Sequence, residues 1–185
     1  MAHSSLVLAS NSPRRQQLLR ELGFKFSVKV RPTSEIFPAT MPPIEVPAYL
    51  ATQKADEFRV DIKQETILCA DTIVVVDNEI LNKPADATEA RMMLKKLSGR
   101  AHQVITGICV MNGQSTQTAT DVATVYFKTL TDNEIDYYIK NYSPFDKAGA
   151  YGVQEWIGMI GIERIEGSYY TIMGLPVHLV YRLLS

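Results

Sequence analysis

The hydrophobic and polar positions of the chain follow two periodicities, one typical of β-strands and one typical of amphipathic helices. The apolar run at 6–9 predicts a strand. The residues after it predict a helix, because Ser12 suits the N-cap, Pro13 suits the first turn and Gly23 suits the position just past the end. The start of the chain therefore predicts a strand, a turn and a helix.

The rest of the chain follows the same rules. A capping box of Asp86 with Glu89 predicts one helix start, and Thr131 with Glu134 predicts another. Asn112-Gly113 predicts a two-residue hairpin. The other expected elements are strands at 26–30, 66–76 and 122–127 and on both sides of Asn112-Gly113, and helices at 47–59, 86–97, 131–140 and from 176 onward, with a Pro-rich loop at 31–47.

Strands adjoin both hairpins and helices along the chain. This order predicts an α/β fold with a mixed central sheet flanked by helices. With 185 residues, 46% of them hydrophobic, the chain has enough apolar residues to form a sizeable core. We expect one globular domain over residues 1–185, with a cleft between two lobes.

Charge and cysteine content narrow the class of protein. A net charge of −1 offers no basic surface for nucleic acid and favours a small anionic ligand at a local site. Cys69 and Cys109 both lie in apolar, strand-like runs, so we expect reduced thiols and a cytoplasmic protein. The uncharged run at 101–120 contains polar residues that are costly in hydrocarbon, so no membrane contact is expected.

Two arginines in an unfavourable place indicate a phosphate site. Arg14 and Arg15 fall in the first turn of the predicted helix, where a cation opposes the helix dipole at roughly 0.3–1 kcal/mol each. An anion there would be bound by free N–H groups and by both guanidinium groups. The alternative is a pair of solvated arginines at a helix start.

Further charged residues stand beside apolar ones. Asp71 interrupts a buried-type strand, where a carboxylate is costly unless it is paired or bound to metal, so either a function or a structural salt bridge is expected. Lys54 flanks the apolar stripe of the predicted helix at 47–59 and is either a functional cation or a surface lysine. With Lys83 and Glu35, these residues supply the cations and carboxylates that phosphoanhydride hydrolysis requires.

Histidine chemistry is not expected. His3, His102 and His178 are far apart in the sequence, and no Cys/His zinc spacing, Walker P-loop or dinucleotide-binding glycine pattern occurs.

Seven short motifs follow one another along nearly the whole chain. They are Ser10-Asn11-Ser12-Pro13-Arg14-Arg15, Glu35, Lys54-Ala55, Ala70-Asp71-Thr72, Lys83-Pro84, Thr106-Gly107 and the segment Asp-Lys-Ala-Gly-Ala-Tyr-Gly-Val-Gln at 146–154. In this order they resemble the Maf family of nucleoside triphosphate pyrophosphatases. The resemblance implies an inosine-triphosphatase-like fold and a homodimeric, cytoplasmic enzyme that requires Mg²⁺ or Mn²⁺. It also implies the conversion of a nucleoside triphosphate and water to the monophosphate and pyrophosphate.

The segment at 147–154 resembles the dTTP/UTP branch of the family rather than the 7-methyl-GTP branch. The Gln154 amide presents an acceptor and a donor side by side, which complements the N3–H and O4 of uracil and thymine. A role in removing modified pyrimidine nucleotides fits the same chemistry. The alternatives are the same reaction on 7-methyl-GTP or another modified nucleotide, and a non-catalytic nucleotide-binding regulator of cell division.

The resemblance also implies roles for single residues. Glu35 and Asp71 would bind the metal, and Asp71 would be either its ligand or the general base. The chain departs from the family pattern at Glu155-Trp156, where a glycine is more usual, and at Ser34, where an aspartate is common; these positions bear on the base pocket and on the number of metal ligands. The implied catalytic residues are Asp71, Glu35, Lys54 and Lys83, and the implied substrate-binding residues are Ser10, Ser12, Arg14, Arg15, Thr72 and Gln154.

Overall fold

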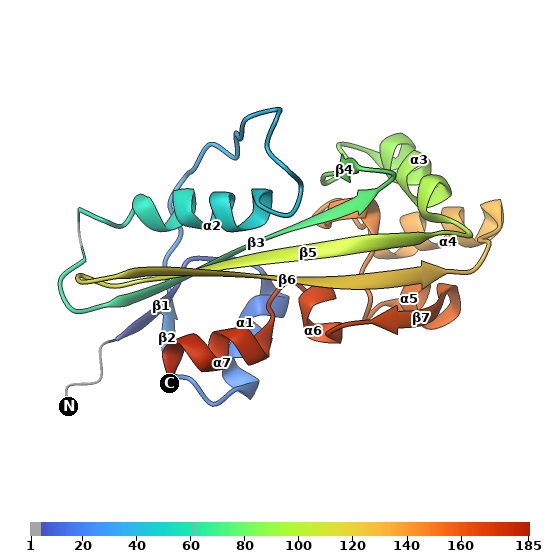
Figure 1. Ribbon diagram of the computed structural model, residues 1–185. Helices are drawn as coiled ribbons and strands as arrows, with labels where there is room; N and C mark the ends of the chain where they lie inside the picture. The colour runs from blue at the N-terminus through green and yellow to red at the C-terminus, as the bar shows by residue number, and fades with distance from the viewer. Residues whose placement is uncertain (1–4, 61) are drawn as a thin grey trace. The chain divides into compact units, whose positions relative to one another are not determined.

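The computed structural model describes residues 5–60 and 62–185, so His3 lies outside the described residues. Figure 1 shows the elements in order along the chain. The strands are β1 (Leu6–Leu8), β2 (Phe26–Val28), β3 (Thr66–Val76), β4 (Glu79–Leu81), β5 (Ala101–Met111), β6 (Thr116–Phe127) and β7 (Ile162–Glu166). The helices are α1 (Pro13–Glu21), α2 (Val46–Asp56), α3 (Ala87–Leu97), α4 (Asp132–Tyr142), α5 (Trp156–Gly161), α6 (Tyr169–Ile172) and α7 (Val177–Leu184), with a short 3-10 helix, η1 (Ala148–Ala150).

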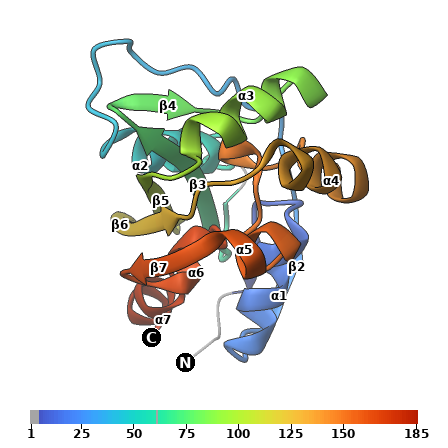
Figure 2. The same cartoon turned by 90° about the vertical axis from the view of Figure 1, so that its right-hand side faces the viewer.

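The strands form one sheet in the order β2-β1-β3-β5-β6-β7, and β4 pairs with β3. Strand β1 runs parallel to β2 and β3, whereas the pairs β3/β4 and β6/β7 are antiparallel. In each part of the chain, helices lie against the strands, as two views at right angles show (Figures 1 and 2). The predicted α/β fold with a mixed sheet flanked by helices is confirmed.

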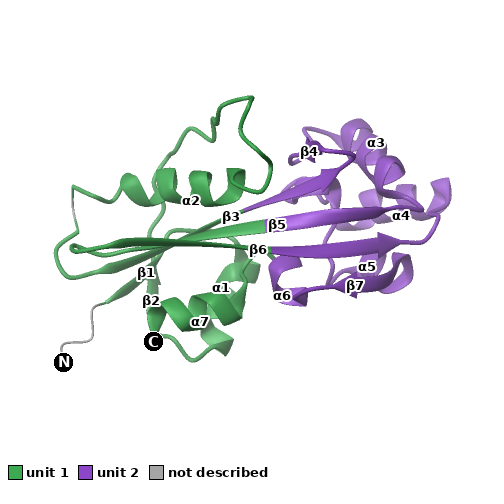
Figure 3. Cartoon of the chain, viewed as in Figure 1, with its two compact units in different colours: residues 1–71, 106–121, 174–185 green, residues 72–105, 122–173 purple. Residues whose placement is uncertain are grey.

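The chain groups into two compact units (Figure 3). Unit 1 comprises the described residues up to 71, residues 106–121 and residues 174–185. Unit 2 comprises residues 72–105 and 122–173, so β3, β5 and β6 contribute residues to both. The single domain expected over residues 1–185 and the expected cleft stay predictions.

In unit 1, α2 covers one face of the strands, and α1 and α7 cover the other (Figure 1). Helix α2 lies very close to the sheet because small residues face it: Ala51 and Ala55 are fully buried. On β5, a Cβ atom at Gly107 would come within 2.1 Å of the Ala48 nitrogen, so only glycine fits there. The core beneath α2 consists of Val7, Ala9, Ala51, Ala55, Phe58, Ile67, Cys69, Cys109 and Met111.

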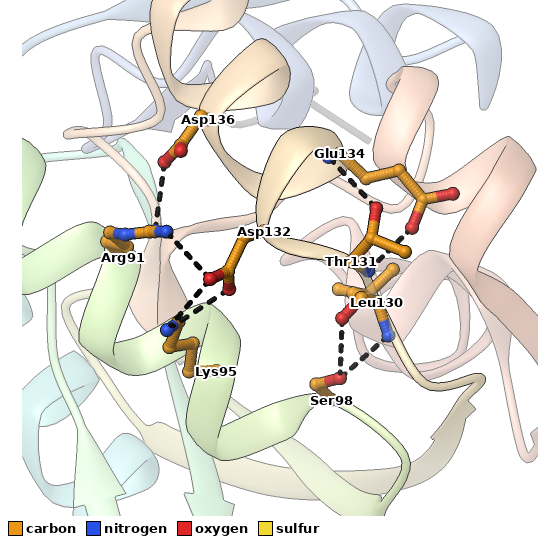
Figure 4. A network of polar contacts seen from close by, with 8 residues as sticks. All are labelled: Arg91, Lys95, Ser98, Leu130, Thr131, Asp132, Glu134 and Asp136. Carbon is orange, nitrogen blue, oxygen red and sulfur yellow. Dashed lines mark hydrogen bonds and ion pairs between the residues drawn. The ribbon is translucent and has the colours of Figure 1, made fainter.

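In unit 2, helices α3 and α4 are joined by charged side chains (Figure 4). Arg91 lies 3.1 Å from Asp136 and 3.3 Å from Asp132. Lys95 also pairs with Asp132, at 3.1 Å. The two carboxylates and Lys95 are more than half exposed, so each ion pair adds little stability.

The capping box predicted at the start of α4 is confirmed. The Thr131 hydroxyl accepts the Glu134 N–H at 3.3 Å, and the Glu134 carboxylate accepts the Thr131 N–H at 2.8 Å. At α3 only half of the predicted box forms. Asp86 accepts the Glu89 N–H at 2.9 Å, but the Glu89 carboxylate binds the N–H of the preceding Ala85, at 2.7 Å.

Several predicted boundaries were wrong by a few residues. Helix α2 ends at Asp56 rather than at 59, because the chain tightens into a turn in which the Phe58 N–H donates to the Ala55 carbonyl, and the Phe58 ring is thereby buried. The hairpin forms, but its tip is at 113–114. The Asn112 side chain accepts the N–H groups of Gln114 and Ser115, both at 2.9 Å, which makes Asn112 the first corner of the turn.

The ends of other elements also differ slightly from the predicted ones. Strand β2 stops at 28, α4 extends to 142, and α7 begins after Pro176. Within the described residues, no helix is both long enough and apolar enough to cross a membrane.

Replacing Gly107 by alanine is expected to lower the free energy of unfolding by about 1–3 kcal/mol, because the added methyl group collides with the backbone of α2. Gly113→Ala is the matched control, since its new methyl group would lie 3.8 Å from the Lys63 carbonyl oxygen, an ordinary van der Waals distance. Urea unfolding of both variants tests the prediction. Equal stabilities would show that α2 does not depend on this close approach.

Replacing Thr131 by alanine removes the hydroxyl of the capping box and should cost about 1 kcal/mol of stability. Asp136→Asn breaks an exposed ion pair of the same helix and should cost at most about 0.5 kcal/mol. Thermal and urea unfolding of the two proteins check this order. A larger loss in Asp136→Asn would mean that the ion network, not the cap, stabilises α4.

Candidate active site

The parallel ladder of β1 and β3 places the first motif beside the middle of β3. Leu8 pairs with Leu68, and the next N–H, that of Ala9, donates to the Leu68 carbonyl at 2.9 Å. The chain then turns at Ser10 and enters α1 after Ser12. The loop that follows a parallel strand and opens a helix is a common place for anion binding.

The two serines of this loop shape the turn. The Ser10 hydroxyl accepts the Ser12 N–H at 3.2 Å, and the Ser12 hydroxyl accepts the Arg15 N–H at 3.4 Å. Ser12 is therefore the N-cap that the sequence predicts, with Pro13 in the first turn and Gly23 in a left-handed conformation after the last. Ser10 is buried, with 8% of its surface exposed.

Three of the predicted catalytic side chains meet at the end of Lys54. Its Nζ atom contacts Asp71 Oδ1 and lies 2.7 Å from Glu35 Oε1. The side chains of Lys54 and Asp71 are 18% and 12% exposed, whereas that of Glu35 is 48% exposed. The ammonium group thus turns toward two carboxylates instead of extending into solvent, and Asp71 has the charged partner that a buried strand position requires.

The loop that carries Glu35 is also held by the residue next to Lys54. Gln53 Nε2 donates to the Ile36 carbonyl at 3.1 Å. Its Oε1 atom is buried and has no hydrogen-bond partner among the described residues. Sequence reasoning did not single out Gln53, and its position beside Lys54 was the sole signal that could have done so.

Arg15 turns back onto the sheet. Its Nε donates to the Gly174 carbonyl and its Nη1 to the Ala70 carbonyl, both at 2.8 Å. Burial lowers the pKa of Arg15 while Asp71 nearby opposes that shift, and a guanidinium group stays charged throughout the physiological range. Arg15 therefore places a positive charge close to Asp71, whereas Arg14, the neighbouring predicted residue, is half-buried.

The remaining predicted residues belong to unit 2. Thr72 follows Asp71 on β3 and is half-buried. Lys83 is exposed just after β4, and the carbonyl of the preceding Asn82 accepts the Gly149 N–H at 3.1 Å, which ties this segment to η1. Gln154 is half-buried and lies in a turn.

A histidine or cysteine metal centre is absent from the described residues, in which no group of three or more metal-binding side chains gathers. Burial lowers the pKa of His102 to about 4, and its Nε2 lies 2.8 Å from the Tyr151 hydroxyl. His178 is exposed, with Nε2 4.0 Å from Asp121. Glu35 and Asp71 are instead a pair of carboxylates, the ligand type that Mg²⁺ combines with water and phosphate oxygens.

Comparison with known proteins identifies relatives along the full length. The family model described as "Maf-like protein" matches residues 5–185. A "dTTP/UTP pyrophosphatase" of Porphyromonas gingivalis is 50% identical, over 97% of this chain and 92% of that protein. Proteins of the same name are 49% identical in Phocaeicola vulgatus, over 95% and 92%, and 45% identical in Cytophaga hutchinsonii, over 95% and 80%.

A solved HAM1 protein from Coxiella burnetii is similar over 67% of this chain and 73% of its own, at 20% identity and a TM-score of 0.41. The assignment rests on the sequence relatives and on the family match, which extends from residue 5 to the last residue. The chain therefore belongs to the Maf family.

Proposed function

We propose that this protein is a nucleoside triphosphate pyrophosphatase that hydrolyses dTTP and UTP to the monophosphate and pyrophosphate. The names of relatives that are 45–50% identical over nearly the whole chain support this function. The observation that carries it is the contact of Lys54 with both Glu35 and Asp71, because it gathers one cation and two carboxylates beside Arg15.

In this proposal the triphosphate is held by cations and by the loop before α1. Arg14 and Arg15 stand in the first turn of α1, where helix N–H groups also favour an anion. Lys54 and Lys83 add positive charge for phosphate oxygens. Ser10, Ser12 and Thr72 supply hydroxyl groups for the same oxygens.

Glu35 and Asp71 would hold a divalent cation, Mg²⁺ or Mn²⁺. Their oxygens fit such an ion because both approach one positive group, the Lys54 ammonium, and because Glu35 remains accessible to solvent. The ion, when bound, neutralises charge on the phosphates and polarises the phosphoryl group that is attacked.

The proton of the attacking water needs an acceptor. In the alternative in which Asp71 is the general base rather than a metal ligand, its carboxylate receives the proton while the water oxygen bonds to the α-phosphorus. The bond from that phosphorus to the bridging oxygen breaks, and the electron pair leaves with pyrophosphate. The proton neutralises Asp71, and the Lys54 ammonium beside it is then free to offset negative charge on the phosphate oxygens.

Gln154 would recognise the base. Its amide matches the N3–H and O4 of uracil and thymine, whereas cytosine presents the reverse pattern of donor and acceptor. A mismatched base leaves polar groups unpaired, at about 1–3 kcal/mol for each.

The cellular setting is also a proposal: a cytoplasmic homodimer of single-domain subunits that binds neither nucleic acid nor membranes. Cys69 and Cys109 are free and buried, and burial raises the pKa of Cys69 to about 12, so this group stays a thiol. Two protected thiols are compatible with a reducing compartment.

The reaction is tested by separating the products from dTTP, UTP, CTP and 7-methyl-GTP by ion-exchange chromatography, with Mg²⁺ or Mn²⁺. We expect monophosphate and pyrophosphate from dTTP and UTP, and no product after the metal is chelated. Release of orthophosphate and a diphosphate would contradict the proposal. Preferred turnover of 7-methyl-GTP would place the enzyme in another substrate class, and binding without turnover would indicate a regulator.

Asp71→Asn keeps the shape of the side chain and removes its charge, so kcat should fall by at least about 10²-fold. Asp56→Asn, an exposed position at the end of α2, is the matched control and should retain normal activity. Measuring Mn²⁺ binding to Asp71→Asn separates the two roles left open for Asp71. Unchanged Mn²⁺ affinity would identify Asp71 as the general base, and lost affinity would identify it as a metal ligand. Normal kcat in the folded variant would make Asp71 structural.

A further inference from the structure

Unit 2 contains a buried polar network that the reaction above does not use. Its centre is Tyr138 on α4, whose side chain is fully buried. The Gly152 N–H donates to the Tyr138 hydroxyl oxygen at 3.0 Å, and the hydroxyl donates to the Glu155 carboxylate. One hydroxyl thus connects two points of the segment around Gln154.

Those two points are the ends of the turn that carries Gln154. The Glu155 N–H donates to the Gly152 carbonyl at 3.0 Å, which closes a four-residue turn with Gln154 at its third position. Because Tyr138 binds the backbone N–H of Gly152 and the side chain of Glu155, both ends of the turn are fastened to α4.

The negative charge of Glu155 is balanced by the ammonium group of Lys147. Lys147 Nζ is 3.0 Å from Glu155 Oε1 and 2.8 Å from Asp146 Oδ1, and the Lys147 side chain is only 8% exposed. Burial, and the Glu155 carboxylate beside it, raise the pKa of Tyr138, so its hydroxyl keeps its proton and remains the donor. An acid, a base and a hydroxyl therefore form a satisfied network with a fixed direction.

The turn also has little room to shift. A Cβ atom at Gly152 would lie 2.8 Å from Glu155 Cδ, so the backbone rests against the carboxylate. A Cβ atom at Gly158 would lie 2.0 Å from the Val153 carbonyl oxygen, so the backbone of α5 packs directly on the turn. Hydrogen bonds and close packing thus fix the same four residues.

We propose that Tyr138 and Glu155 are positioning residues that orient the turn carrying Gln154 and thereby set the preference of the enzyme among pyrimidine bases. The inference rests on the proposed function. Neither residue is assigned a contact with the base. Their effect arises because an amide discriminates between bases only while its donor and acceptor keep their directions.

The test compares kcat/KM for dTTP and dCTP in wild type and in Tyr138→Phe, which keeps the buried ring and removes the hydroxyl. The dTTP/dCTP ratio should fall about tenfold, and the loss should appear as a higher KM for dTTP with kcat nearly unchanged, because base contacts act before and during the reaction alike. Tyr137→Phe is the matched control, since the Tyr137 side chain is half exposed on the same helix. It should leave the ratio unchanged.

A double-mutant cycle with Gln154→Ala separates positioning from a general loss of stability. If Tyr138 acts through Gln154, adding Tyr138→Phe to Gln154→Ala leaves the ratio where Gln154→Ala alone puts it. A purely structural role would lower the melting temperature and leave the ratio of the single variant at the wild-type value. That result, or additive effects on the ratio, would overturn the inference.

The outcomes also distinguish a failure of this inference from a failure of the proposed function. No turnover of dTTP or UTP by the wild type overturns both. Turnover with no preference for dTTP over dCTP leaves the pyrophosphatase reaction but overturns base recognition by Gln154 and, with it, the positioning role. An unchanged ratio in Tyr138→Phe overturns only the positioning role. If Tyr138→Phe fails to fold, Glu155→Gln takes its place. It keeps an acceptor for the Tyr138 hydroxyl and removes the charge that pairs with Lys147. The dTTP/dCTP ratio of this variant, and its double-mutant cycle with Gln154→Ala, then test the positioning role.

Discussion

The contact of one ammonium group with two carboxylates is the interaction on which the candidate site depends. Asp71 lies inside an otherwise apolar strand, so its charge must be compensated from outside the strand. Lys54 compensates it only because α2 lies directly on the sheet, and α2 lies there because Ala51, Ala55 and Gly107 leave no side chain in the way. Small residues therefore determine where the charges meet.

A second cation, Arg15, lies near the same carboxylate, because its Nη1 donates to the carbonyl of Ala70, the residue before Asp71. Arg15 belongs to α1, which covers the face opposite α2 (Figure 1). At the start of a helix a cation is unfavourable by itself, and its two bonds to the carbonyls of Gly174 and Ala70, with the charge of Asp71 nearby, offset that cost. Arg15, one of the two arginines that indicated a phosphate site, therefore also has hydrogen-bond partners within the protein.

Local signals predicted most elements, and distant contacts explain what was missed. Caps and apolar periodicity predicted α1, α3 and α4 because those signals act within a few residues. Helices α5 and α6, of six and four residues, span fewer than two turns, and β7 has only five residues, so their apolar patterns are too short to be distinctive. The charged residues of the candidate site could be identified from their unusual positions in the sequence. The hydrogen bond by which Tyr138 supports the Gln154 turn joins residues that are 14 positions apart on different elements, and no local sequence pattern predicts such a contact.

The two units each contain a lysine that contacts two carboxylates, and the hydrogen bonds around the buried pair separate a site from a support. Lys147 and Glu155 are 8% and 20% exposed, the second carboxylate, Asp146, is 58% exposed, and the Tyr138 hydroxyl also donates to Glu155, so Glu155 is held by two buried partners. Lys54 and Asp71 are covered to a similar degree, and the second carboxylate there, Glu35, is 48% exposed and stands on a loop. An incoming cation or phosphate can displace an exposed carboxylate at little cost, whereas separating Glu155 from its two buried partners would leave buried charges unpaired. The same ion-pair chemistry therefore favours ligand exchange around Glu35 and rigidity around Gln154.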